Sequence, residues 1–171
     1  MDPRGTGFAP EMSAMLQEAL NHLLKEHTTL KLATVDAQRL PWVATAYFAT
    51  DDPFTLTVLI EAGGRTLANI RDNPNVAIMV EQGDPLTLFA QADATARLVD
   101  ERHEEIRQAI TDKVPNSAPL VALPRLIAVR LDVQSWRLTH VPAGWLPARE
   151  LVRPGTRPQL GSGAPAGSAR A

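Results

Sequence analysis

The chain has 171 residues, 44% of them hydrophobic, which is enough for one domain with a hydrophobic core and too little for two ordinary ones. Seventeen Lys and Arg residues stand against nineteen Asp and Glu residues, so the formal net charge of -2 does not indicate binding to nucleic acid or to a membrane surface. The absence of cysteine excludes disulfides, thiolate catalysis and cysteine-ligated zinc.

The two ends of the chain differ in composition from its middle. Residues 1–7 lack the basic start and apolar stretch of a secretory signal, and no apolar run approaches the roughly twenty residues of a transmembrane helix. We therefore expect a cytoplasmic protein without a membrane partner. Residues 1–9 are expected to be flexible and residues 10–153 to form a single domain. Residues 154–171 are rich in Gly, Ser, Pro, Ala and Arg, which predicts a disordered tail because such a segment buries too little apolar area to offset the entropy of ordering.

A helix and two strands open the predicted domain. Apolar residues recur at steps of three and four over residues 10–27, which indicates an amphipathic helix. Extended segments follow at residues 30–35 and 41–50, joined by a link of hairpin length. The second segment is apolar on both faces, so it is covered on both sides or one face lines a pocket. Its small residues at positions 44–46 either leave room for a flat ligand against the backbone or fit a crowded barrel interior.

A glycine-led turn follows a third extended segment at residues 54–61. Gly63, Gly64 and Arg65 open a short helix that ends before Pro74, because the residue before a proline resists helical geometry. Paired glycines let the backbone turn without steric penalty, and the N–H groups of the first helical turn can face an anion together. Arg65 adds a cationic fork at the same place. If the protein binds a phosphate, this turn is therefore the first place to expect it; the alternative is a tight turn with an exposed arginine.

The remaining segments predict three more strands and one helix. Residues 75–82 and 126–133 are extended, and residues 86–99 alternate between an alanine-rich apolar face and a more polar one. Small alanines on a packed face indicate strong curvature, as a closing barrel requires. A mostly polar helix at residues 101–111, capped by Asp100, separates the last two strands.

Together these segments predict a mainly β fold. Six mostly antiparallel strands with several hairpin-length links indicate a small closed or nearly closed barrel, with an N-terminal helix and two shorter helices. No nucleophile with a partner base is recognisable, and the histidines have no evident metal partners. The sequence therefore identifies no catalytic side chain and predicts no metal site, and any chemistry belongs to a cofactor.

At this point the chain resembles a known family. Residues 32–36, 41–48, 64–77 and 94–99, in this order and spacing, are similar to the pyridoxamine 5′-phosphate oxidase-like FMN-binding split-barrel superfamily. The resemblance extends over most of the predicted domain. It implies a six-stranded antiparallel split β-barrel of Greek-key type that forms a homodimer, with FMN bound between the subunits.

The resemblance also implies which residues hold the cofactor. In such proteins the phosphate lies on the strand-to-helix turn, the flavin ring lies along the second and third strands, and a C-terminal aromatic residue approaches from the partner subunit. Carried over to this chain, these residues are Ala44, Thr45, Ala46, Ile60, Arg65, Thr66, Asn69 and Trp136, with Trp145 as the alternative aromatic residue.

Thr66 departs from the family pattern, in which a second cation usually follows the arginine. One charge-assisted phosphate contact corresponds to about 1.5–3 kcal/mol, so this position affects how tightly FMN binds. The substrate-binding Arg and His of true pyridoxamine-phosphate oxidases have no convincing match, so we do not expect a vitamin B6 enzyme.

The sequence therefore predicts an FMN-binding oxidoreductase that acts on a small organic substrate. Two alternatives stay open. One is a reductase that uses a deazaflavin coenzyme in place of FMN, which would need an extended basic groove for its longer anionic tail. The other is a flavin- or haem-binding module without turnover of its own, which the missing second cation favours.

Overall fold

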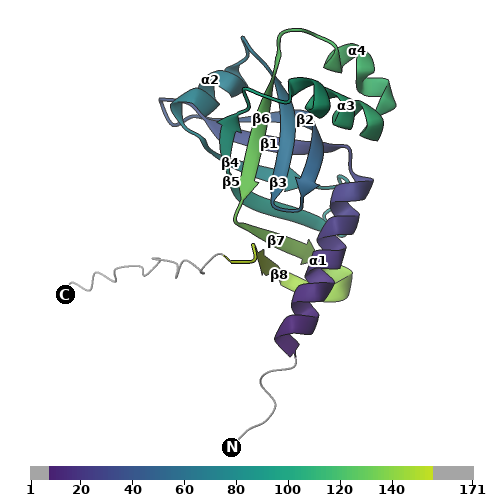
Figure 1. The fold of residues 1–171 in the computed structure, drawn as a ribbon. Helices are drawn as coiled ribbons and strands as arrows, with labels where there is room; N and C mark the ends of the chain where they lie inside the picture. The colour runs from purple at the N-terminus through teal and green to yellow at the C-terminus, as the bar shows by residue number, and fades with distance from the viewer. Residues whose placement is uncertain (1–7, 156–171) are drawn as a thin grey trace, which may run out of the picture.

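Six strands close into an antiparallel barrel, which forms the upper part of the molecule in Figure 1. The computed structural model describes residues 8–155. Around the barrel the strands follow the order β4-β1-β2-β3-β6-β5, and β5 pairs back with β4. The predicted mainly β, six-stranded antiparallel barrel is confirmed. The strands are β1 Thr29–Val35, β2 Pro41–Asp52, β3 Thr55–Glu61, β4 Asn75–Val80, β5 Phe89–Leu98 and β6 Leu126–Val133.

A further hairpin extends the sheet beyond the barrel. β7 (Ser135–His140) pairs with the first residues of β5, and β8 (Trp145–Val152) pairs with β7. The sequence predicts its last strand at residues 126–133, so β7 and β8 were not expected. The reason is physical, because β8 is an edge strand that tolerates Pro147 and shows no regular alternation of apolar residues.

Four α-helices cover the barrel and the hairpin: α1 (Phe8–Glu26), α2 (Arg65–Asp72), α3 (His103–Lys113) and α4 (Ala118–Val121). α1 packs against β5 and β8, α2 contacts β1, β2 and β3, and α3 packs against β2 and β6 (Figure 1). Two 3-10 segments, η1 (Pro115–Ser117) and η2 (Val141–Ala143), complete the chain. None of the helices in residues 8–155 is long and apolar enough to cross a bilayer.

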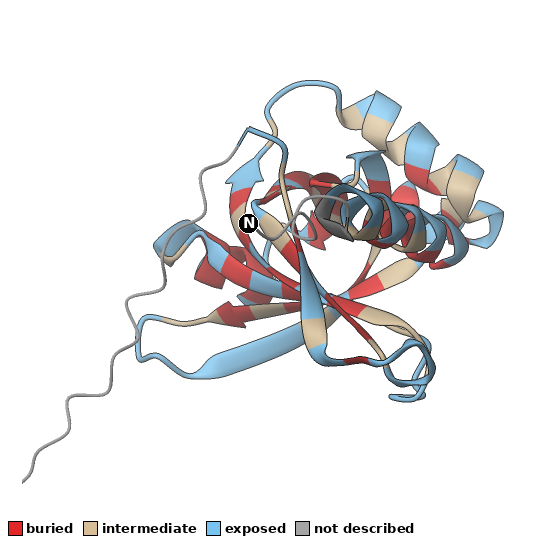
Figure 2. Ribbon diagram, turned by 90° about the horizontal axis from the view of Figure 1, so that it is seen from below, coloured by how far each residue is buried: buried red, intermediate tan, exposed pale blue. Residues whose placement is uncertain are grey.

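The core lies inside the barrel and continues under α1. Buried residues alternate with more exposed ones along β1, β4 and β5, whereas β3 is buried over most of its length. Figure 2 shows buried segments on the strands and on the inner sides of helices. Ala90, Ala92, Ala94 and Ala96 of β5 are all buried, as their spacing predicts. Leucines of α1 join the same core cluster, so the amphipathic helix predicted from the sequence places its apolar face on the barrel.

Three local predictions differ from the structure. β5 begins at Phe89 because a turn precedes it, in which Asp84 Oδ1 accepts the Leu86 N–H at 2.9 Å. α3 begins at His103 with Arg102 as its N-cap, so the predicted cap at Asp100 is wrong. α1 begins within the stretch predicted to be flexible, and the rest of that stretch lies outside the described residues. The predicted tail also lies outside them, apart from residues 154 and 155.

Candidate functional site

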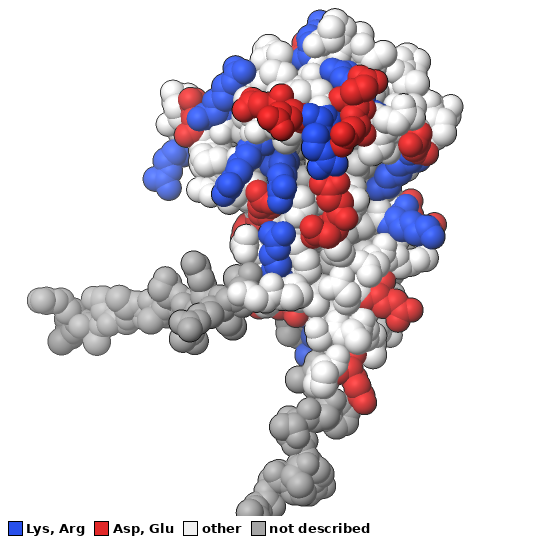
Figure 3. All heavy atoms as spheres, viewed as in Figure 1, with Lys and Arg blue, Asp and Glu red and all other residues white. Residues whose placement is uncertain are grey.

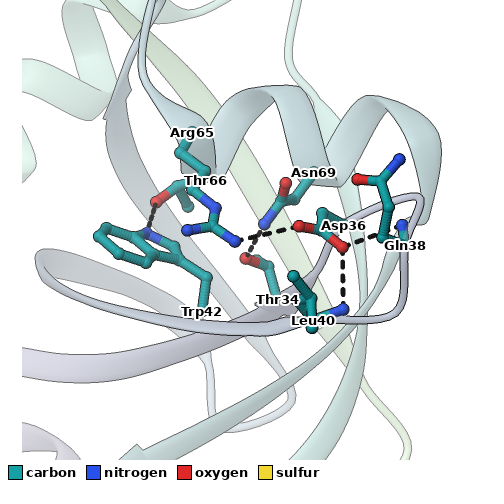
Figure 4. Close-up of polar contacts among 8 residues, drawn as sticks. All are labelled: Thr34, Asp36, Gln38, Leu40, Trp42, Arg65, Thr66 and Asn69. Atoms are coloured by element: carbon teal, nitrogen blue, oxygen red, sulfur yellow. Dashed lines mark hydrogen bonds and ion pairs between the residues drawn. The ribbon is translucent and has the colours of Figure 1, made fainter.

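A cluster of polar side chains lies where α2 meets the ends of β1 and β2 (Figure 4). We call it the α2 cluster. It brings together residues that are far apart in the sequence, from β1 and the turn after it, from β2 and from α2. Its members are Thr34, Asp36, Trp42, Arg65, Thr66 and Asn69.

Arg65 is the cationic centre of the α2 cluster. Its Nη2 lies 3.0 Å from Asp36 Oδ2, and its guanidinium carbon lies 4.8 Å from the centroid of the Trp42 ring. The side chain remains 45% exposed. An arginine held between a carboxylate and an aromatic face keeps its orientation, and its remaining N–H donors stay accessible to a ligand.

Asp36 both holds Arg65 and closes the β1–β2 turn. Its Oδ1 accepts the N–H of Leu40 at 2.8 Å and the N–H of Gln38 at 3.0 Å, whereas its Oδ2 faces Arg65. The hydrogen bond from Leu40, supported by Arg65 and Gln38, holds the pKa of Asp36 below its ordinary value. Asp36 is therefore ionised at neutral pH and competes with any anionic ligand for Arg65.

Thr66 and Asn69 form the buried side of the cluster. The Thr66 hydroxyl accepts a hydrogen bond from Trp42 Nε1 at 3.2 Å, and Asn69 Nδ2 donates to Thr34 Oγ1 at 3.0 Å. Only 7% of Thr66 and 3% of Asn69 are exposed. These two side chains bind the strands beneath α2, so they fix the position of the helix as well as lining the cluster.

The N-terminus of α2 lacks a capping side chain. Gly64 is the N-cap residue, and the first hydrogen bond within the helix runs from the Ala68 N–H to the Gly64 carbonyl at 3.2 Å. The N–H groups of residues 65–67 precede that bond, and the first turn contains no acidic residue. Such an end attracts an anion through its N–H groups and the helix dipole.

The reason for the glycines differs from the prediction. Gly64 has φ -84° and ψ 159°, and Gly63 is not at positive φ either, so the turn does not require glycine for its backbone geometry. What Gly64 provides is the absence of a capping side chain. Glu61 is the nearest acidic residue, and it forms a 3.6 Å ion pair with Arg125.

The residues predicted to contact a flavin ring lie on both faces of β2 and on β3. Ala46 is 7% exposed and Ile60 is 6% exposed, and both belong to the barrel core, so only their backbones can reach a ligand. Ala44 is partly buried on the same face of β2. Thr45 lies on the other face, where Lys31 Nζ donates to its hydroxyl at 3.2 Å.

An apolar hollow of about 230 Å³ lies beside Thr45, between β2 and β3 on one side and α3 and α4 on the other. Tyr47 and Leu59 line it from the strands, and Ile110 and Leu120 line it from the helices. Its volume is below the roughly 300 Å³ at which small-molecule sites usually begin. The hollow can take part of a flat ring, and a whole cofactor needs further surface.

The two C-terminal tryptophans do not join the α2 cluster. Trp136 is fully buried in the core, and its Nε1 donates to the Pro53 carbonyl at 2.7 Å. Trp145 is 6% exposed and lies edge-on to His140. Trp136 therefore serves the core of its own chain in this structure, and the aromatic residue found at the cluster is Trp42.

Asp36, Trp42 and Thr34 belong to the cluster although they were not predicted from the sequence as site residues. Asp36 follows β1 and Trp42 begins β2, so the hairpin carries both toward the same end of the barrel. An acidic residue and an aromatic residue flanking a hairpin turn were the available signal. Their meeting with α2 depends on tertiary structure.

Comparison with known proteins gives one family match. The family model described as pyridoxamine 5′-phosphate oxidase matches residues 16–140. No curated protein matches the sequence significantly.

Three solved structures illustrate the range of similar proteins. ChuZ of Campylobacter jejuni superposes with a TM-score of 0.70 at 17% identity, over 81% of this chain and 60% of that one. HutZ, the heme storage protein of Vibrio cholerae, gives 0.55 at 28% identity, over 69% of this chain and 89% of that one. A putative pyridoxamine 5′-phosphate oxidase of Listeria innocua gives 0.56 at 16% identity, over 72% and 97%. This chain thus spans 60% of the length of ChuZ.

Proposed function

The chain belongs to the pyridoxamine 5′-phosphate oxidase family, and from this we propose that it is an FMN-binding oxidoreductase that acts on a small organic substrate. The observation that carries the proposal is the N-terminus of α2. It combines uncapped N–H groups, no acid in the first turn and a half-exposed arginine at the first helical position. These are the features with which proteins bind a phosphate group.

The residues present fit a phosphate. The Arg65 guanidinium and the N–H groups of residues 65–67 would hold it. The Thr66 hydroxyl already accepts a hydrogen bond from Trp42, so its own proton stays available for donation. Trp42 keeps this hydroxyl and the Arg65 fork in place. The position that lacks the second cation is thus filled by a neutral donor held by an aromatic side chain.

FMN, when bound, supplies hydride or electron transfer through its ring. The chain's own residues bind and orient the cofactor. Backbone groups of residues 44–46 and the hollow beside Thr45 lie along β2, the strand on which the ring was predicted. No side chain of this region is assigned as an acid or a base.

We further propose that the protein is a homodimer with the cofactor between its subunits. Trp42 of the α2 cluster is 40% exposed, and its chain neighbours Leu40 and Val43 are 56% and 61% exposed. A group of exposed apolar side chains beside a polar site is typical of an interface. A second copy placed there would also enlarge the site, which the small hollow beside Thr45 requires.

The proposal is tested by titrating the purified protein with FMN and following the quenching of flavin fluorescence. Arg65→Ala should weaken binding by about tenfold or more, because it removes a charge-assisted contact to phosphate. Arg71→Ala is the matched control, since Arg71 lies exposed in the last turn of the same helix, outside the α2 cluster. Equal affinities of the two variants and the unchanged protein would disprove the phosphate site.

Haem binding is the second candidate function. It is favoured by the similarity to HutZ, which has 28% identity to this chain and is named as a heme storage protein. The absorption spectrum of protein purified without added cofactor separates the two: a Soret band would support haem, and a flavin spectrum would support the first proposal. In a competition experiment, a deazaflavin that displaces FMN would identify the deazaflavin as the coenzyme. NADPH-dependent reduction followed by substrate-dependent reoxidation would distinguish an enzyme from a binding module.

A further inference from the structure

Three arginines line a hollow of about 550 Å³ on the outer face of the barrel, away from the members of the α2 cluster. Arg97 comes from β5, Arg130 from β6, and Arg153 directly follows β8. Figure 3 shows basic side chains gathered on the face formed by β5 and β6, with acidic ones among them. We call this place the arginine hollow.

The sheet register places two of the arginines directly opposite each other. Arg97 of β5 pairs with Arg130 of β6. Like charges at directly opposite positions destabilise a sheet unless an anion lies between them. The side chain of Asp132 partly provides this anion: its Oδ1 accepts from Arg130 Nε at 2.8 Å, and its Oδ2 lies 3.8 Å from Arg97 Nε.

Asp132 leaves the arginine hollow with an excess of positive charge. It is the one acidic residue among the residues that line the hollow, against three arginines, so the formal charge of the lining is +2. Both contacts with Asp132 use the Nε atoms of the arginines. Arg97 and Arg130 are 72% and 46% exposed, so their terminal NH₂ groups remain accessible to a ligand.

Arg153, on the third segment, is held by two hydrogen bonds. Its backbone N–H donates to the Gln134 carbonyl at 2.8 Å, and its Nη2 donates to Thr55 Oγ1 at 3.2 Å. Thr95, which pairs with Asp132 across the strands, adds a hydroxyl to the lining. The hollow thus combines guanidinium groups on three separate segments with a neutral hydroxyl donor.

We propose that the arginine hollow binds a compact dianion, with a phosphate monoester as the ligand class. A charge of +2 matches a dianion, and the planar guanidinium fork suits the oxygens of a phosphate group. The chain as a whole has a net charge of -2, so the positive charge is confined to this hollow. Such a local charge suits a small ligand better than a long polyanion such as nucleic acid. The site is separate from the α2 cluster, and the proposal does not depend on FMN.

A neighbouring groove gives the organic part of such a ligand a place to lie. The groove has a volume of about 970 Å³ and shares Thr95, Asp132 and Gln134 with the arginine hollow. Much of the rest of its lining comes from β1 and β4 and includes Ala33, Val35 and Ala77. A phosphate ester bound at the arginines would therefore place its organic group in this groove.

The test is calorimetric titration with glycerol 2-phosphate, a simple phosphate monoester. Arg130→Gln should weaken binding by about tenfold or more, because it removes a charge-assisted contact. Asp132→Asn should have the opposite effect and tighten binding severalfold, since it removes the carboxylate that competes for two arginines. Arg149→Gln, on the exposed part of β8 and outside the lining, is the matched control and should leave the affinity unchanged.

Two outcomes would overturn the proposal. One is the absence of saturable binding to the unchanged protein. The other is binding that Arg65→Ala abolishes and Arg130→Gln leaves intact, because the probe would then occupy the α2 cluster alone. Arg97→Gln repeats the glycerol 2-phosphate titration at a second arginine of the hollow, and its 72% exposure means that the substitution carries little risk to folding. Circular dichroism verifies that each variant is folded. FMN titration of Arg130→Gln shows whether the proposed FMN site is intact, so that loss of glycerol 2-phosphate binding is not mistaken for loss of that site.

Discussion

Asp36→Asn best separates the two roles of Asp36, which are to close the β1–β2 turn and to form an ion pair with Arg65. The two oxygens of Asp36 have different partners: Oδ1 accepts the N–H groups of Gln38 and Leu40, and Oδ2 faces Arg65 at 3.0 Å. Asparagine retains the first oxygen and replaces the second by an NH₂ donor, which cannot accept from a guanidinium. The substitution therefore preserves the turn and removes the ion pair.

The magnitude follows from the exposure of the pair. Arg65 is 45% exposed and Asp36 is 17% exposed, and ion pairs near the surface are weak because water screens them. A phosphate that takes over Arg65 must break this pair, so its removal should tighten FMN binding by between about 1.4-fold and fivefold. The stacking of Arg65 on Trp42 keeps the guanidinium in position after the change.

The assay is the FMN fluorescence titration, accompanied by urea unfolding. Asp36→Asn should leave the urea midpoint of unfolding nearly unchanged. Asp36→Ala, which also removes both turn hydrogen bonds, should lower that midpoint clearly. If Asp36→Asn weakens FMN binding as strongly as Arg65→Ala does, Asp36 orients the arginine for its ligand and the competition described above is refuted.

Three further substitutions test the packing of the site and the core. Asn69→Ala should lower the free energy of unfolding by about 1–3 kcal/mol in urea, because it leaves the buried Thr34 hydroxyl without its donor; no loss would contradict the hydrogen bond. Trp136→Phe should cost about 1–2 kcal/mol in the same assay, since the Pro53 carbonyl loses its partner, and should leave FMN affinity unchanged. Burial lowers the pKa of Lys113 to about 8 from 10.5, so unfolding takes up a proton between these values. The free energy of unfolding should therefore rise with pH there by about 1–2 kcal/mol, and Lys113→Met should lack the rise.

The α2 cluster shows why family resemblance alone gives an incomplete view of this site. The resemblance directs attention to the position after Arg65, where Thr66 replaces a cation. The structure shows that the Thr66 hydroxyl is engaged by Trp42 Nε1 and that Trp42 also stacks on Arg65. One aromatic residue thus supports both side chains of the proposed phosphate site. At the proposed site we therefore expect the affinity for FMN to depend on Trp42 and Asp36 as well as on the missing cation.

Local pattern determined the six barrel strands of this protein and the place of its candidate site in the chain. Alternation marked the alanines of β5 as a packed face, because neighbouring residues of a strand point to opposite sides of a sheet. Gly64 and Arg65 were identified at the start of a helix, because the signals that begin and end a helix lie within a few residues of each other. These properties are local, so they can be read from the sequence.

Tertiary structure decided which side chains meet. Arg65 contacts Asp36 across 29 positions, Trp42 reaches Thr66 across 24, and Asn69 reaches Thr34 across 35. Arg97 lies opposite Arg130 only through the register of β5 and β6. A shift of one residue in a strand would point each of its side chains to the other face of the sheet. Such contacts are fixed by barrel closure and by the packing of α2, which no local pattern encodes.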